Sequence, residues 1–142
     1  MTVMSVKLRS LPETGAAVGW GGSHSVIVDR PLDKAGGTGL GFNGGQLLAL
    51  AIGGCLCNDL HYVAHEMGIS LSQLAVDVEV SFDGRPLVAT AAEVRIAVEA
   101  DDPAADLDEL VRRAKAASTV SNSLARGIPV NVKGPGLALS LT

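Results

Sequence analysis

The feature that most constrains this chain is one long helical pattern, which runs from about Gln46 to Met67. Its first half is apolar on nearly every side, and this is typical of a helix buried on most of its surface. Its second half is amphipathic and ends before Gly68, a suitable left-handed cap. Other elements must therefore surround the helix, although 142 residues supply only one modest core.

Two consecutive glycines, Gly53 and Gly54, lie in the middle of this helix. Each weakens the helix by roughly 1 kcal/mol relative to alanine. Such a cost is easiest to understand where another backbone has to approach closely. We therefore expect a close packing contact at this point of the helix.

Short strands precede the helix and longer strands follow it. Residues 1–10 contain a candidate edge strand, and Gly21-Gly22 separates two short apolar runs, as in a β-hairpin. After the helix, residues 74–82 and 92–100 alternate apolar and polar side chains, which predicts a second hairpin with one apolar face. A helix must cover that face.

A second amphipathic helix is predicted after Asp101 and Asp102, either of which can cap it, with Pro103 in its first turn. We expect a short helical turn within residues 118–127 and a last strand around residues 128–132. This order of strands, long helix, two strands, helix and strand predicts a single α+β domain over residues 1–142, with antiparallel sheet.

Charge and hydropathy exclude several classes of protein. The net charge is −4 and no basic run is present, so the electrostatic footprint of a nucleic-acid binder is missing. The first dozen residues lack the apolar core and cleavage site of a signal peptide. The most apolar stretch, residues 47–60, is well short of the ~20 residues of a membrane-spanning helix. We expect a cytoplasmic protein with no nucleic-acid or membrane partner, whose cysteines lie in a reducing compartment.

Cys55 and Cys57 both lie in the apolar part of the helix. Residues two apart on a helix point to different sides, so these two cysteines cannot form a disulfide without unwinding it. A buried free cysteine is most often a small hydrophobe, whereas a nucleophile needs a cation or an acid–base partner. No histidine or arginine is near Cys55 in the sequence, so any activator must come through the fold.

Cys57, His61 and His65 share one stripe of the helix, at a spacing of four residues. His61 and His65 could together hold a zinc or copper ion. A structural zinc site prefers four ligands, however, and His24 is the only other histidine. The simpler interpretation is a polar stripe that faces solvent or a partner subunit, and we expect no metal and no cofactor.

The segment "FNGGQLLALAIGGC", which ends at Cys55, resembles the start of the central helix of the OsmC/Ohr family (osmotically inducible protein C and organic hydroperoxide resistance protein). The segments "STVSNSLARGIPVNV" and "VGWGGSHSVIVDRP" resemble its second signature and its amino-terminal hairpin. The resemblance covers nearly the whole chain. It implies an OsmC-like α+β fold and an intertwined homodimer, whose two central helices are buried where the subunits meet.

The resemblance also implies a chemistry for the helix cysteine. In active family members this cysteine attacks an organic hydroperoxide and becomes a sulfenic acid. A second cysteine then forms a disulfide with it, and dithiols such as lipoyl groups reduce that disulfide. Cys55 aligns with the attacking cysteine, whereas Cys57 matches no position of the motif.

The chain departs from the family at three functional positions. Ser118 stands where the resolving cysteine belongs, Gly45 stands where the catalytic glutamate belongs, and Arg9 and Arg30 are the only candidates for the activating arginine. Two functions therefore remain open. One is a peroxidase that reduces organic hydroperoxides through Cys55 in a one-cysteine cycle, with an external thiol as reductant. The other is a catalytically degenerate dimer that binds a small apolar ligand without turnover.

Overall fold

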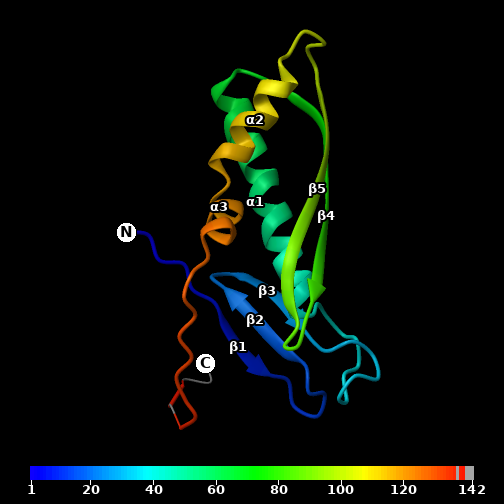
Figure 1. Ribbon diagram of the computed structural model, residues 1–142, viewed down its shortest axis with the longest axis vertical. Helices are drawn as coiled ribbons and strands as arrows, with labels where there is room; N and C mark the ends of the chain where they lie inside the picture. Colours follow the sequence, from blue (N-terminus) through cyan, green and yellow to red (C-terminus); the bar gives the residue numbers. More distant parts are fainter. Residues whose placement is uncertain (137, 140–142) are drawn as a thin grey trace. The chain divides into compact units, whose positions relative to one another are not determined.

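The computed structural model describes residues 1–136, 138 and 139 (Figure 1). The order of its elements is three strands, a helix, two strands and two helices, and both sheets are antiparallel. This confirms the predicted α+β class. The contacts divide the chain into two units, residues 1–47 with 131–142 and residues 48–130, and each is described by itself below.

The first unit holds a three-stranded sheet, and β1 lies at its edge, as the sequence predicts. The next two strands form the predicted hairpin, in which Gly21 pairs with His24. Gly22 occupies the turn with a φ of 59°, a conformation that glycine adopts without a steric penalty. The strands, in spatial order, are β1 (Lys7–Ser10), β2 (Ala17–Gly21) and β3 (His24–Val28).

One carboxylate, that of Asp29, organises the glycine-rich loop after β3, and its side chain is fully buried. It accepts hydrogen bonds from the backbone N–H groups of Arg30 (2.7 Å), Thr38 (3.0 Å) and Leu40 (3.1 Å). It also accepts one from the Thr38 hydroxyl at 2.7 Å. These bonds, above all the one from the Thr38 hydroxyl, lower the pKa of Asp29 to about 2. The ionised carboxylate therefore holds the loop in place.

We expect Asp29→Asn to destabilise the protein near neutral pH and much less in acid. The folded-state pKa of about 2 lies below the ordinary value of 3.8. The ionised carboxylate therefore stabilises the folded state in full when the pH is above the ordinary pKa of 3.8, and this contribution is lost as the pH falls through about 2. Thermal unfolding followed by circular dichroism between about pH 6 and about pH 2 measures this. The wild-type melting temperature should approach that of the variant in acid, and a gap that stays constant would contradict the role given to Asp29.

The long helix α1 (Gly44–Glu66) begins two residues before the predicted start. Asn43 and Gln46 form a capping box at this end. The Asn43 side chain accepts a hydrogen bond from the backbone N–H of Gln46 (2.9 Å), and the Gln46 side chain accepts one from the backbone N–H of Asn43 (3.0 Å). At the other end Gly68 has a φ of 68°, so the predicted glycine cap is confirmed.

By length and composition, α1 is the one helix in the described part of the chain that could cross a membrane. With 23 residues, α1 is longer than the apolar stretch 47–60, which is too short by itself to span a membrane. The central helix of a globular core meets the same criteria, and 33% of the most apolar window of α1 is buried in this structure. Its buried residues are Ile52, Gly53, Leu56, Leu60, Val63 and Ala64.

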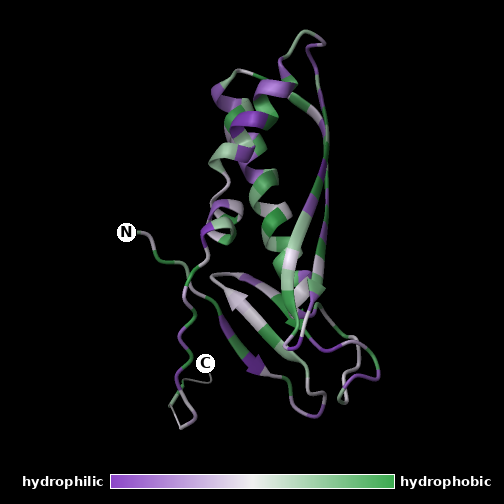
Figure 2. Ribbon diagram, in the orientation of Figure 1, coloured by the Kyte–Doolittle hydropathy of each residue, from purple (hydrophilic) through white to green (hydrophobic). Residues whose placement is uncertain are grey.

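The second unit contains a long antiparallel hairpin, β4 (Leu71–Asp83) and β5 (Val88–Ala100), which confirms the second predicted hairpin. Figure 1 shows α1 along one face of this hairpin, with α2 (Leu107–Ala117) beside it. In Figure 2 the first half of α1 is mostly hydrophobic, whereas hydrophilic residues appear along its second half. Two helices thus cover the apolar face of the hairpin. The buried core cluster consists of Leu60, Val63, Ala64, Leu110 and Ala114.

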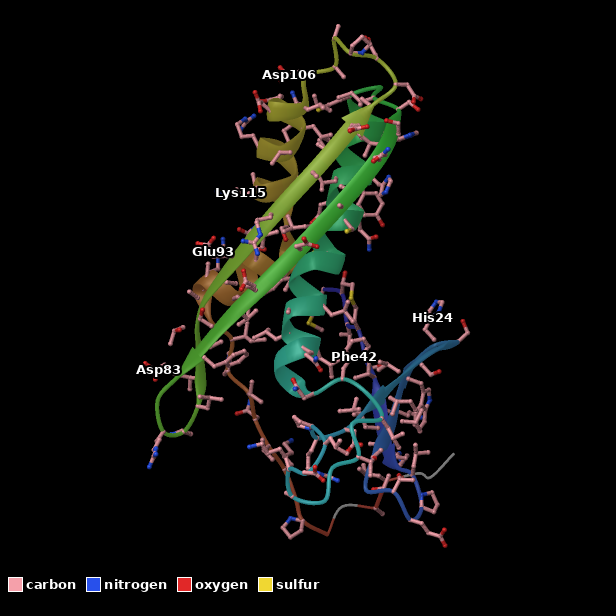
Figure 3. The ribbon with its side chains drawn as sticks, turned by 90° about the vertical axis from the view of Figure 1, so that its right-hand side faces the viewer. His24, Phe42, Asp83, Glu93, Asp106 and Lys115 are labelled. Atoms are coloured by element: carbon pink, nitrogen blue, oxygen red, sulfur yellow. The ribbon has the colours of Figure 1, made fainter. Side chains whose placement is uncertain are left out.

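The predicted cap of the second helix is wrong. Asp106 is the N-cap of α2, and its side chain accepts a hydrogen bond from the backbone N–H of Glu109 at 3.0 Å; Figure 3 labels it where the helix begins. Neither Asp101 nor Asp102 caps the helix, because the Asp102 side chain instead accepts from a backbone N–H two residues later, at 2.8 Å. Pro103 therefore lies in a turn that precedes the helix.

The last predicted strand is also wrong for the described chain. The predicted helical turn is an eight-residue helix, α3 (Thr119–Arg126), and residues 128–132 follow it as irregular backbone. Ile128, Val130 and Val132 are exposed by 70, 79 and 90%. The alternation that predicts a strand is present, but a strand needs a neighbour for its backbone N–H and C=O groups. No strand of the described residues pairs with this segment.

Candidate functional site

Four hydrogen-bonded side chains connect the middle of α1 to the beginning of α3. Cys55 Sγ donates to Asp59 Oδ2, which is 3.4 Å away and one turn later in α1. Ser118 Oγ lies 3.7 Å from Cys55 Sγ and 3.2 Å from Ser121 Oγ. All four residues belong to the second unit. They bring the predicted attacking cysteine into contact with the serine at the predicted resolving position.

Cys55 is half-buried, and therefore differs from an ordinary core residue. Its neighbours explain this position: Ile52 and Leu56 are buried on the face that packs inward, whereas Gly54 and Asn58 are exposed. The thiol thus lies at the boundary between the packed and the outer face of α1. A reactive cysteine needs such partial exposure, because a reagent has to reach its sulfur.

Ser118 is fully buried and is the N-cap of α3, yet its side chain makes no cap hydrogen bond. An N-cap serine usually accepts a hydrogen bond from the first turn of its helix, which is worth about 1 kcal/mol. Here the hydroxyl contacts Cys55 and Ser121 instead, and its single proton can be donated to only one of them at a time. Ser118 is also the C-cap of α2, so this contact places the thiol where the negative end of the α2 dipole and the positive end of the α3 dipole meet.

Asp59 lies on the same side of the predicted helix as Cys55, but the sequence assigned it no role, and the structure shows that the two side chains are hydrogen-bonded. It lies four residues after the cysteine on the same helix, a spacing at which two side chains can meet. The spacing Cys-x-x-x-Asp was therefore the available signal. Of the two side chains that contact the Cys55 sulfur, Ser118 is distant in sequence and reaches it through the fold, whereas Asp59 lies on the same helix.

A groove of about 450 Å³ opens beside these side chains within the second unit. Ser121 lines it, and so does Ile52, one turn before Cys55. Most of its other lining is apolar and comes from α1, β4, β5 and α3. A groove with largely apolar walls and two hydroxyl groups, those of Thr90 and Ser121, suits a small, largely apolar molecule that carries a polar group.

The two candidate arginines are both engaged within the first unit. Arg9 donates to the carbonyl of the preceding residue at 2.8 Å, and its guanidinium lies 5.7 Å from the ring centroid of Trp20. Arg30 donates to the Gly15 carbonyl at 3.1 Å and lies 3.6 Å from the Asp29 carboxylate.

The two helix glycines have different surroundings. A Cβ atom on Gly53 would lie 3.0 Å from Val78 Cγ2, so a close packing contact is present there, but the neighbour is a side chain of β4 and not the backbone that we expected. A Cβ atom on Gly54 would meet nothing within 4 Å. Gly54 and Leu50, which is 54% exposed, lie on the outer face of α1. Gly45, at the predicted glutamate position, lies in the first turn of α1 and carries no functional side chain.

His61 and His65 are exposed on α1, and Cys57 is half-buried. Among the residues that the structure describes, no three histidine, cysteine, aspartate or glutamate side chains gather in a group that could hold a metal ion. The structure therefore gives no support to the metal site that the spacing of these residues allowed.

Comparison with known proteins agrees with this architecture. The sequence model of the OsmC-like protein family matches residues 37–133. An OsmC-like protein from Mycoplasma pneumoniae is similar in structure, with 15% identity, a TM-score of 0.72, and coverage of 87% of this chain and 88% of that chain. The organic hydroperoxide resistance protein OhrB of Bacillus subtilis has 22% identity, a TM-score of 0.56, and coverage of 86% and 90%. At such identities the structural likeness shows the fold alone. No curated protein matches the chain by sequence.

Proposed function

Because the chain belongs to the OsmC-like protein family, we propose that it is a thiol-dependent peroxidase that reduces organic hydroperoxides through Cys55. The observation that carries this proposal is the contact of a half-buried thiol with Ser118 at the start of α3, beside an apolar groove. Proteins of the same fold from Bacillus subtilis and Legionella pneumophila are named as organic hydroperoxide resistance proteins, which supports this class of substrate.

The cycle that we propose uses one cysteine. The Cys55 thiolate attacks one peroxide oxygen, an S–O bond forms as the O–O bond breaks, and the products are a sulfenic acid and an alcohol. The hydroxyl of Ser118, which we align with the resolving cysteine, cannot form a disulfide. A small external thiol therefore condenses with the sulfenic acid and releases water, and a second thiol then cleaves the mixed disulfide and restores Cys55.

We propose that the protein acts as a homodimer and that residues 1–142 form one domain in it. Two observations support the dimer. The outer face of α1 exposes Leu50, Ala51 and Gly54, a stripe that can receive a closely packed partner. Ile128, Val130 and Val132 have the alternation of a strand but no strand beside them in the described chain, and a second copy could supply one.

We place the protein in the cytoplasm, where low-molecular-weight thiols are available as reductants. We expect no nucleic-acid partner, because the net charge is −4 and no basic stripe is present. We expect no membrane partner either, because α1, the one described helix of sufficient length, packs in a core.

A second candidate function is the binding of a small apolar ligand without turnover. The groove beside Ser121 favours it, as does the absence of a carboxylate at Gly45. In this case the Cys55 thiol would be inert, and the chain would share only the groove and the dimer with active members of the family.

The test of the proposed function is to trap the first intermediate. The protein is treated with one equivalent of cumene hydroperoxide in the presence of dimedone, which captures sulfenic acids. Intact mass and peptide mapping should then show a single adduct on Cys55. An unmodified protein would refute the peroxidase, and ligand binding in the groove would become the leading function.

A further inference from the structure

We propose that Asp59 is the acid–base catalyst of Cys55, an inference that rests on the proposed peroxidase function. In this role its carboxylate takes the proton of the thiol and returns it to the alkoxide that leaves when the peroxide bond breaks. The contact that carries the inference is the hydrogen bond of 3.4 Å from Cys55 Sγ to Asp59 Oδ2. Asp59 therefore touches the reacting atom itself.

Asp59 can accept this proton without leaving two negative charges beside each other. If Cys55 lost its proton to water, a thiolate and a carboxylate would lie next to each other as two negative charges. Transfer from Sγ to Oδ2 along the hydrogen bond moves one negative charge and creates no second one.

The surroundings of the sulfur favour this direction of charge movement. The Ser118 hydroxyl can donate to Sγ, so it stabilises a thiolate that forms there. Ser118 is both the C-cap of α2 and the N-cap of α3, so the opposite ends of two helix dipoles meet at this residue, and the donor to the sulfur is its hydroxyl group.

The chemical step balances with one hydroperoxide and no other reactant. The Cys55 thiolate attacks the distal peroxide oxygen, the electron pair of the O–O bond passes to the alkoxide, and the carboxylic acid of Asp59 protonates that alkoxide. The sum is a thiol and a hydroperoxide giving a sulfenic acid and an alcohol, and Asp59 is ionised again. An alkoxide is a strong base and leaves poorly without a proton, whereas the carboxylate that leaves from a peroxyacid needs none.

This difference between leaving groups gives the experiment. The rate of Cys55 oxidation is measured by quenched-flow mass spectrometry with cumene hydroperoxide and with peracetic acid, for the wild type and for Asp59→Asn. We expect Asp59→Asn to slow the reaction with cumene hydroperoxide on the order of a hundredfold, the usual contribution of an acid–base group. The reaction with peracetic acid should slow by less than about tenfold, since its leaving group requires no proton. Glu66→Gln, the same kind of change at an exposed carboxylate of α1, should alter neither rate.

Three results would overturn the inference: an equal loss with both oxidants, unchanged rates, or faster oxidation of the variant. An equal loss would show that Asp59 only positions the sulfur. Faster oxidation would show that the negative charge of Asp59 slows the reaction of Cys55 with peroxide. If Asp59→Asn does not fold, Asp59→Ser takes its place, because serine can accept the thiol hydrogen bond but cannot carry its proton. A wild-type protein that reacts with neither oxidant would instead refute the proposed function, and that result precedes any variant.

Discussion

Cys55→Ser is expected to abolish hydroperoxide consumption, whereas Cys57→Ser is expected to keep the wild-type rate. A serine hydroxyl cannot form the sulfenic acid on which the proposed cycle depends. Cys57 lies two residues further along α1, on a different side of the helix, and takes no part in the hydrogen bonds among Cys55, Asp59 and Ser118. The measurement is the loss of cumene hydroperoxide with dithiothreitol as reductant, and for Cys55→Ser it should fall to the rate of dithiothreitol alone.

The pair of variants also separates the alternatives for the cysteines. If both variants match the wild type, neither thiol is the source of the activity and the peroxidase is wrong. If Cys57→Ser also loses activity while its thermal unfolding stays unchanged, the cycle uses two thiols. The one-cysteine mechanism would then have to be abandoned.

The elements that the sequence predicted well are those whose signals are local. The helix pattern of α1, its cap at Gly68 and the alternation along β4 and β5 each follow from the residues of one segment, and the structure confirms all three. The predicted burial of the first half of α1 on most of its surface is not met within the described chain, where Leu50, Ala51 and Gly54 are exposed. The start of α2 was wrong because Asp102 and Asp106 are equally good caps in isolation. In the structure the Asp102 side chain accepts a hydrogen bond within the turn before the helix, so Asp106 is the residue that caps α2. The last strand could not be judged from its own residues, because pairing depends on a second segment.

The candidate site was predictable only in part. The resemblance identified Cys55 and Ser118, and the structure brings these two side chains within 3.7 Å. The contact between Asp59 and Cys55 was not predicted, although the two lie on the same side of the helix, because helices carry many pairs of residues four apart and the spacing does not say whether the two side chains meet. The groove was missed as well, since its walls come from three different parts of the chain.

Leu60→Ala is expected to destabilise the protein by about 2–5 kcal/mol, the usual cost of this truncation in a packed core. Leu60 is fully buried in the cluster formed by α1 and α2, so a smaller side chain leaves a cavity that its neighbours cannot fill. Leu50→Ala is the matched control: it is the same substitution in the same helix, at a side chain that is 54% exposed within the subunit. Urea unfolding followed by circular dichroism gives the free energy of unfolding of both variants.

The dependence on protein concentration then tests the proposed dimer. The cavity left by Leu60→Ala lies inside one subunit, so its cost should be the same at every protein concentration. If a second copy covers the outer face of α1, Leu50→Ala weakens association, and its effect on unfolding should grow as the protein is diluted. A Leu50→Ala variant that unfolds like the wild type at all concentrations would show that this stripe is not the interface. The exposed segment 128–132 would then remain as the place where a partner could bind.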